Sequence, residues 1–297
     1  MPPKASWVSL PIVADVVRHD DLADFWAATE GFFGGDPVFH TVPIAAVHRR
    51  LAHPDPSDRP PLLLTVAEQG EVVAAAVRTP PWPLTLSGVP ARWADVVAEE
   101  LAGTELDGVN GPRPEAEAFV RAWTARTGCD AREVMALRLF RLEGLAEPTG
   151  VPGTSRAATE ADAELLVRWY LEFVDESTPY DPDEEHAWTY VRGTLSFGAG
   201  HHLWLHDGEP VSWACAGRPA SGMSRIGPVF TPEQHRRNGY AEAVTSACAR
   251  WALGAGAEHV VLYTDLANPT SNSIYQRLGF RPVCDAAEFA FTPPDPA

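Results

Sequence analysis

The hydrophobic and polar positions of the first half of this chain follow a helical period, then the alternation of strands, then both again. Residues 20–51 show two helical patterns, and two apolar, β-branched runs on either side of Glu68–Gly70 predict a β-hairpin. An amphipathic helix, a short strand and a second helix follow, the last one ending at Gly128. Residues 132–145 then predict a strand that closes this half.

The stretch AEPTGVPGTS after that strand contains two prolines, two glycines and small polar residues, a composition typical of a linker. We place the linker at residues 147–155. It separates an amino-terminal domain at residues 1–146 from a carboxy-terminal domain at residues 156–297.

The second half repeats the order of elements found in the first. Both halves have the order helix, helix, hairpin, helix, strand, helix and strand, although their amino-acid sequences hardly match. In the second half these elements lie at residues 159–177, 182–195, 201–217, 239–256, 259–267, 269–280 and 286–292, with one further strand at 223–230. We interpret the order as a structural duplication whose chemistry has diverged. The fold class is α/β.

Composition and charge narrow the class of partner. Hydrophobic residues make up 45% of the chain, and ten tryptophans are ample for a core. The 40 acidic residues against 23 basic ones give a formal net charge of −17, which argues against nucleic acid as the main partner. A small phosphorylated ligand that is bound locally remains compatible with this balance.

The cysteines and the apolar stretches indicate a soluble, cytoplasmic protein. Cys129, Cys215, Cys248 and Cys284 are scattered without a CxxC pair, as expected for reduced thiols rather than a disulfide framework or a zinc site. The start of the chain has no long apolar core after its one lysine, and no apolar run reaches the length of a membrane span. We therefore predict no leader and no membrane association.

One polar stretch, TPEQHRRNGYAEAV from Thr231 to Val244, combines two arginines with a glycine at the start of a helix. The first N–H groups of a helix have no partner within it, and its dipole favours an anion there. Gly239 and the small Ala241 would let a phosphate approach the backbone. An ordinary helix start with solvated arginines explains the same letters equally well.

A second motif, NPTSNSIYQRLGF, follows about thirty residues later and decides between these interpretations. Ser271 and Tyr275 are four apart on one helix face, and Asn268 lies where the preceding strand ends. This order, a strand, RxxGxA, a helix, a strand and NxxSxxxYxxxGF, resembles the GCN5-related N-acetyltransferase (GNAT) superfamily. The likeness covers roughly residues 200–291. Segments such as RTPPWPLTLS also resemble a predicted-acetyltransferase branch with a degenerate first half.

The resemblance implies tandem GNAT-like folds, each a mixed, mostly antiparallel sheet flanked by helices, and acetyl-CoA as co-substrate. Tyr275 would be the general acid that protonates the leaving sulfur, and a backbone N–H at the end of the strand would polarise the thioester carbonyl. The implied cofactor-binding residues are Val229, Phe230, Thr231, Arg236, Arg237, Asn238, Gly239, Tyr240, Ala241, Asn268 and Ser271.

The first half lacks the glycine turn of this motif. Its equivalent stretch, SGVPARWADVV, has proline and alanine where the glycine should stand. We therefore expect this half to bind no pyrophosphate, to pack against the second half and to supply one wall of the substrate pocket.

The general base is not distinguished by spacing. The family commonly uses a carboxylate or an ordered water, and the candidates here are Asp175, Glu176, Asp265 and Glu288. No metal is expected, because His202 and His206 on one strand would lie about 13 Å apart.

These patterns predict an N-acetyltransferase that moves an acetyl group from acetyl-CoA directly to an amine of a small molecule or peptide. No positioned cysteine–histidine pair calls for a covalent enzyme intermediate. The acidic balance favours a cationic acceptor. The alternatives are a non-catalytic acyl-CoA-binding sensor or partner-binding module, and an aminoacyl-tRNA-using transferase, against which the acidic charge counts.

Overall fold

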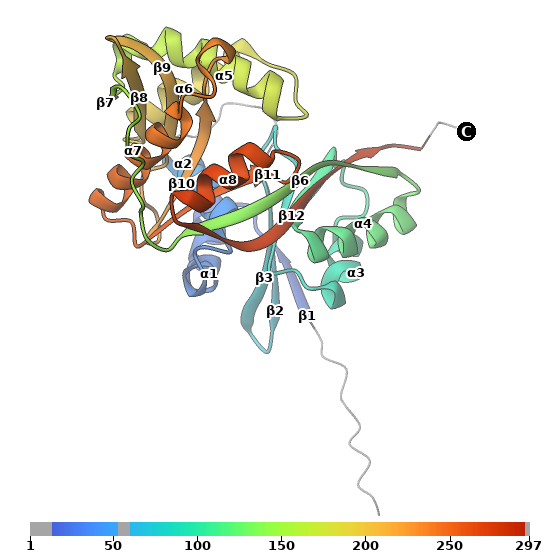
Figure 1. Cartoon of the computed structure of the whole chain (residues 1–297). Helices are drawn as coiled ribbons and strands as arrows, with labels where there is room; N and C mark the ends of the chain where they lie inside the picture. Colours follow the sequence, from blue (N-terminus) through green and yellow to red (C-terminus); the bar gives the residue numbers. More distant parts are fainter. Residues whose placement is uncertain (1–13, 53–59, 295–297) are drawn as a thin grey trace, which may run out of the picture.

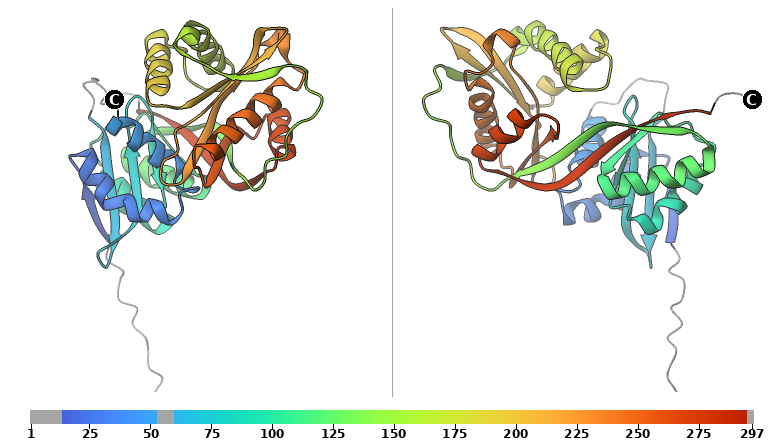
Figure 2. Two further views of the ribbon diagram at one scale, coloured as in Figure 1. Left: turned by 90° about the vertical axis from the view of Figure 1, so that its left-hand side faces the viewer. Right: turned by 45° about the vertical axis from the view of Figure 1, so that its right-hand side comes forward.

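The structure of the chain is a computed structural model, and it describes residues 14–52 and 60–294. The segment on which the absence of a leader was predicted falls largely on residues 1–13, which lie outside the described part. Two lobes stand side by side, and two long strands, β6 (Asp130–Leu142) and β12 (Phe280–Thr292), run together between them (Figures 1 and 2).

Both predicted hairpins and the predicted helices of each half are present. The remaining elements of the first half are β1 (Ala14–Arg18), α1 (Leu22–Gly35), α2 (Thr41–Ala52), β2 (Leu62–Glu68), β3 (Glu71–Arg78), β4 (Leu84–Ser87), α3 (Ala91–Glu100), β5 (Gly108–Pro112) and α4 (Arg113–Thr127). The remaining elements of the second half are β7 (Thr154–Ala157), a 3-10 turn (Glu160–Asp162), α5 (Ala163–Ser177), α6 (Glu184–Ser196), β8 (Gly200–His206), β9 (Glu209–Ala216), β10 (Met223–Phe230), a 3-10 turn (Glu233–His235), α7 (Tyr240–Gly254), β11 (His259–Asp265) and α8 (Pro269–Arg277).

All described strands join one 12-stranded sheet in the order β1-β2-β3-β4-β5-β12-β6-β11-β10-β9-β8-β7. Each strand of the first half has a counterpart six strands later in the second half, so that β1 corresponds to β7 and β6 to β12. With this correspondence the order is the same when it is read from either edge of the sheet, so the two halves are related by a pseudo-twofold axis between β12 and β6. Each half has one parallel pair, β4 with β5 and β10 with β11. The last strand of each half lies next to the fifth strand of the other half, which is a reciprocal strand exchange.

Alternation along the strands divides each half into two apolar layers. Leu62, Leu64 and Val66 of β2 pack toward α3 and α4, whereas Leu63 packs toward α1 and α2. In the second half, Ala214 of β9 packs toward α7 and α8, and Trp213 packs toward α5 and α6. Helices therefore cover both faces of the sheet in both lobes (Figure 1).

The layer under α1 and α2 extends beyond the first half. Met223 of β10, Val261 of β11 and Leu139 of β6 all belong to this layer, together with Ile44 and Val47 of α2. Helix α2 thus lies over the second half's parallel pair. This placement brings the first half to the edge of the site described below.

Short strands and strand ends were missed by the sequence patterns. Strands β1 and β4 were not predicted, and β7 begins inside the stretch predicted as a linker. Strand β12 begins at Phe280 rather than at residue 286, because its first residues pair with β6 along a longer ladder than the apolar run alone indicates. The proposed domain boundary remains a prediction, and the exchange of β6 and β12 crosses it.

Candidate active site

Strands β10 and β11 are parallel neighbours for part of their length and then separate. Their ladder ends at the pair Ile226–Leu262, after which β10 continues along β9 and β11 continues along β6. The register of β10 shifts between Ile226 and Val229, and Pro228 in this bulge has no N–H for a ladder. Among the described strands, none pairs with residues 229–231 on the β11 side. The two strands therefore open like a V.

Residues 231–239 lead from the end of β10 into α7 and form a tight loop. Arg237 and Gly239 both adopt left-handed backbone conformations, with φ of 66° and 82°. The side-chain amide of Asn238 donates to two carbonyl groups within the loop, at 3.1 and 3.2 Å. The loop is thus held in shape by its own residues rather than by a ligand.

The N-terminus of α7 has no side-chain cap, because its N-cap residue is Gly239. The first N–H groups of the helix, from Tyr240 and Ala241 onward, have no intrahelical acceptor and carry the positive end of the helix dipole. Gly239, Tyr240 and Ala241 all line the large cavity described below. The arrangement provides backbone donors for an anion, as the sequence motif predicts.

The equivalent position in the first half already holds a carboxylate. Only residues 88–90 connect β4 to α3, and the N-cap there is Pro90. The Glu115 carboxylate accepts a hydrogen bond from the Val89 N–H at 3.1 Å and another from the Gly88 N–H. Burial raises the pKa of Glu115 to about 7. This loop is satisfied by the protein's own acid, which supports the prediction that the first half binds no pyrophosphate.

Helix α8 presents the second motif on the opposite side of the V. The Asn268 side chain caps the helix by accepting the Ser271 N–H at 3.1 Å. Tyr275 is 8% exposed, and its ring contacts Phe280 edge-on at 6.1 Å. Burial raises the pKa of Tyr275 to about 12, and its hydroxyl has no hydrogen-bond partner among the described side chains. The phenol is therefore protonated and available to a ligand.

A cavity of about 1210 Å³ joins these features and extends between the two halves. It contains Tyr275 and every predicted cofactor-binding residue except Asn238, namely Val229, Phe230, Thr231, Arg236, Arg237, Gly239, Tyr240, Ala241, Asn268 and Ser271. Phe230 is mainly a core side chain, 4% exposed and packed against Trp169.

The two arginines of the loop differ in their contacts. Arg236 forms an ion pair with Glu176 and donates to the Thr231 carbonyl at 2.9 Å. Arg237 is exposed and makes no hydrogen bond or ion pair within residues 14–52 and 60–294. Arg236 therefore fastens the loop to α5, and Arg237 is the arginine that is open to a ligand.

The four candidates for a general base fall into two groups. Glu176 and Asp265 line the cavity, whereas Asp175 and Glu288 do not. Glu176 is engaged by Arg236, and Asp265 accepts the Ala267 N–H at 2.8 Å, which ties down its own turn.

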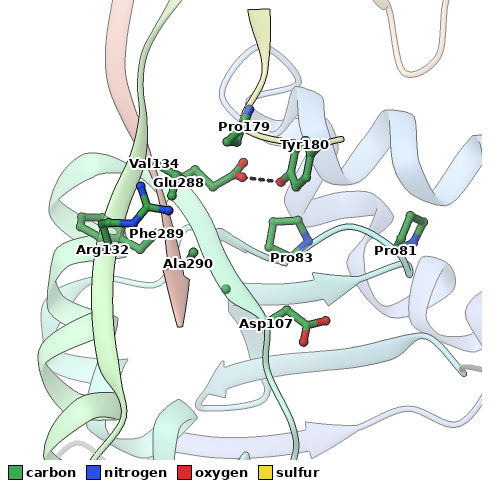
Figure 3. Close-up of a pocket in the computed structure, with 11 residues that line it drawn as sticks. Pro81, Pro83, Asp107, Arg132, Val134, Pro179, Tyr180, Glu288, Phe289 and Ala290 are labelled. Atoms are coloured by element: carbon green, nitrogen blue, oxygen red, sulfur yellow. Dashed lines mark hydrogen bonds between the residues drawn. The ribbon is translucent and has the colours of Figure 1, made fainter. Parts of the chain in front are cut away.

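Glu288 faces a smaller pocket of about 130 Å³, which Figure 3 shows. The Tyr180 hydroxyl donates a hydrogen bond to the Glu288 carboxylate, and burial raises the pKa of Glu288. Pro83 and Arg132 line the same pocket (Figure 3). The contact fastens the loop between α5 and α6 to β12.

The sequence predicted that the first half supplies a wall of the substrate pocket, but it did not single out the residues of that wall. The wall is formed by Arg49 of α2, by Trp82 from the loop between β3 and β4, and by Arg225 of β10. The rings of Tyr170 and Tyr190 stack beside them with their centroids 4.5 Å apart. The one visible signal was Arg225, a charged residue within an apolar strand. Nothing in the sequence indicates that Arg49 lies beside it, because this proximity arises from the packing of α2 over the other half.

Within the described residues, no group of three or more histidine, cysteine or acidic side chains could hold a metal ion. The four cysteines are free, and Cys129, Cys215 and Cys248 are buried. No helix in the described ranges is both long and apolar enough to cross a membrane.

Comparison with known proteins places the second half in a family. Residues 163–280 match the model of the acetyltransferase (GNAT) family, so the second half of the chain carries a GNAT domain. The matched segment contains the V between β10 and β11, the loop and Tyr275. A comparison with curated proteins gave no significant match.

Solved structures show that the likeness in fold extends over both halves. A tandem GNAT protein from the clavulanic acid biosynthesis pathway aligns with a TM-score of 0.55 at 15% identity, covering 96% of this chain and 100% of its own. A Drosophila protein aligns with a TM-score of 0.67 at 12% identity, covering 95% and 99%. A GCN5-related N-acetyltransferase from Kribbella flavida aligns with a TM-score of 0.53 at 18% identity, covering 73% and 86%. The chain thus consists of two GNAT-like folds.

Proposed function

We propose that the second half binds acetyl-CoA and that the protein transfers the acetyl group directly to an amine of a small molecule or peptide. One observation carries the proposal. A single cavity contains the uncapped N-terminus of α7, the open edge of β10 and the unpartnered hydroxyl of Tyr275. These three features support a site for the pyrophosphate, the pantetheine arm and the leaving thiolate of acetyl-CoA.

Each of these features has a distinct task. The N–H groups at Gly239 to Ala241 bind the pyrophosphate, and Arg237 adds charge. The open edge of β10 forms hydrogen bonds with the amides of the pantetheine arm, and an N–H near Val229 polarises the thioester carbonyl. As the amine nitrogen bonds to the carbonyl carbon and the C–S bond breaks, Tyr275 gives its proton to the sulfur.

Water in the cavity accepts the proton of the amine in this proposal. Glu176 is held by Arg236, and Asp265 holds its own turn, so neither carboxylate is free to rotate toward an acceptor. Glu288 lies at the smaller pocket and bonds to Tyr180.

Calorimetry with acetyl-CoA on a matched pair of glycine variants tests the proposal. Gly239 and Gly208 both have left-handed φ angles, of 82° and 85°, so alanine strains either backbone to a similar extent. Only at Gly239 does the added methyl lie at the phosphate loop, where it also comes within 3.0 Å of the Val151 side chain, whereas at Gly208 it meets nothing within 4 Å. Gly239→Ala is expected to weaken acetyl-CoA binding by about tenfold or more, and Gly208→Ala by less than about twofold.

Equal effects of the two variants on affinity would contradict the proposed phosphate site. Tight binding without turnover on any amine would instead support the predicted sensor.

A further inference from the structure

Among the residues that the structure describes, two arginines that line the cavity have no acidic partner, and neither belongs to the phosphate loop. Arg49 reaches the cavity from α2 of the first half, and Arg225 reaches it from β10 of the second half. Neither guanidinium makes a hydrogen bond or ion pair within the described part of the chain. A charged group that is partly buried normally has a partner, so this pair needs an explanation.

No carboxylate within residues 14–52 and 60–294 neutralises the pair. The charges that act on Arg225 come from Tyr263, Arg49 and Tyr190, and burial together with Arg49 lowers the pKa of Arg225. Four acidic residues of the described part line the cavity, and none of them contacts the pair. Glu176 is paired with Arg236 and Glu242 with Arg277; Asp265 caps its turn, and exposed Glu233 lies in the loop after β10.

The phosphates of CoA cannot supply the missing charge. Thr231, where the phosphate loop begins, lies six residue steps after Arg225 along extended chain, and this corresponds to roughly 15–20 Å. A CoA that is anchored at Gly239 and extends along β10 therefore brings its thioester toward Val229 and leaves Arg225 beyond it. The space at Arg225 is the space for the acceptor.

Aromatic side chains form the rest of this wall. Tyr170 and Tyr190 are stacked at 4.5 Å, and the Tyr190 hydroxyl donates to the Gly227 carbonyl at 3.3 Å in the bulge of β10. Trp82 from the first half completes the wall. The two positive charges are thus fixed beside flat apolar faces, in a chain whose net charge is otherwise strongly negative.

We propose that Arg49 and Arg225 bind an anionic group, a carboxylate or a phosphate, of the amine acceptor. The acceptor is then a small amine that carries its own anion, such as a free amino acid or a phosphorylated amino sugar. Guanidinium groups bind both anions through paired N–H donors. This inference rests on the proposed function, because only an acetyl transfer has an amine acceptor. It reverses the preference for a cationic acceptor that net charge alone suggests.

Binding of simple anions tests the pair without requiring turnover. Benzoate and phenyl phosphate are titrated into the full-length protein by calorimetry, with and without CoA, and benzamide is the uncharged control. At least one anion is expected to bind about tenfold or more tightly than benzamide. Whichever anion binds more tightly identifies the group as carboxylate or phosphate.

Variants assign the binding to the two arginines. Arg49→Gln and Arg225→Gln should each weaken anion binding by about tenfold or more, without changing the affinity for acetyl-CoA. Arg121→Gln, on the exposed face of α4, is the matched control and should change neither. If Arg225→Gln does not fold, Arg49→Gln and Arg225→Lys decide, since lysine keeps the charge and loses the paired donors.

Equal binding of benzamide and both anions, or anion binding that neither variant weakens, would overturn the inference. A second assay separates its failure from that of the proposed function. CoA release is compared for amino acids and their amides, and for amino-sugar phosphates and their unphosphorylated forms. Turnover that favours the uncharged member of each pair overturns the inference and leaves the proposed function standing. Failure to bind acetyl-CoA, with anion binding intact, overturns the proposed function alone.

Discussion

At the scale of single residues, burial determines which groups of the site can take part in proton transfer. The pKa of Tyr275 rises to about 12 because the apolar surroundings disfavour the phenolate. A general acid has to carry its proton when the leaving group departs. The shift therefore keeps the Tyr275 phenol protonated over the whole physiological range, as the proposed general acid must be.

The pH dependence of acetyl transfer should show this shift. Activity should not fall between about pH 8 and pH 10 through loss of the Tyr275 proton, because the raised pKa delays that loss until pH approaches 12. Tyr275→Phe should lower kcat about a hundredfold across the range.

Tyr180→Phe is the matched control, since this hydroxyl bonds to Glu288 outside the large cavity. A wild-type rate that halves near pH 10, the ordinary tyrosine value, would show that the phenol is not shielded as described.

Glu115 gives a second prediction at this scale, and it concerns stability. Its folded pKa of about 7 lies above the ordinary value of 4.5, so the folded state holds the proton more strongly than the unfolded state. The stabilisation is fully present below pH 4.5 and is lost as pH rises through 7, by an amount on the order of 3 kcal/mol.

In urea titrations, the free energy of unfolding of the wild type minus that of Glu115→Gln should therefore be smaller at pH 8 than at pH 5. A difference that is the same at both pH values would contradict the assignment of the buried acid.

At the scale of elements, the strand exchange links the two halves more closely than their separate sequence patterns indicate. Phe140 of β6 belongs to the first half in sequence, yet it is fully buried in the apolar layer under α7 and α8. Gly279 makes a close approach to the Gly144 carbonyl, which lies 1.9 Å from where a Cβ would stand. The second half is thus completed by residues of the first half.

The local elements of the fold could be predicted from the sequence, whereas the contacts between distant parts of the chain could not. Helices with strong periodicity and hairpins with paired left-handed residues, such as Asp207–Gly208, are local features, and both were predicted. The partner of a strand depends on contacts far along the chain, so neither the exchange of β6 and β12 nor the proximity of Arg49 to Arg225 follows from local pattern. Short strands such as β7 carry too few apolar residues to be distinguished from a linker.

At the scale of the whole molecule, the exchange predicts that the halves do not fold alone. Residues 156–297 lack β6, which separates β11 from β12 in the sheet. Separating residues 156–297 from residues 1–146 exposes the apolar layer around Phe140 and Phe280. Burial of each such side chain stabilises the fold by about 1.5–3 kcal/mol.

The carboxy-terminal half expressed alone should show a disordered near-ultraviolet circular dichroism spectrum and bind no acetyl-CoA, and co-expression with residues 1–146 should restore both. A cooperatively folded, acetyl-CoA-binding half would instead support two independent domains.

The duplication also gives the two halves separate tasks within one cavity. The second half has the uncapped helix and the open strand edge, whereas the first half fills its own loop with Glu115 and contributes α2 and Trp82 to the opposite wall. In the proposed function, the second half binds the phosphates of acetyl-CoA and the first half shapes the acceptor side. The central claim is that the joint cavity transfers an acetyl group to an amine.

Mass spectrometry of the products formed from acetyl-CoA and a panel of amines tests this claim most directly. We expect free CoA to appear in a one-to-one ratio with a mono-acetylated amine, and no acetylated protein to accumulate. Bound acetyl-CoA that stays intact with every amine on the panel, anion-bearing amines included, would contradict the account.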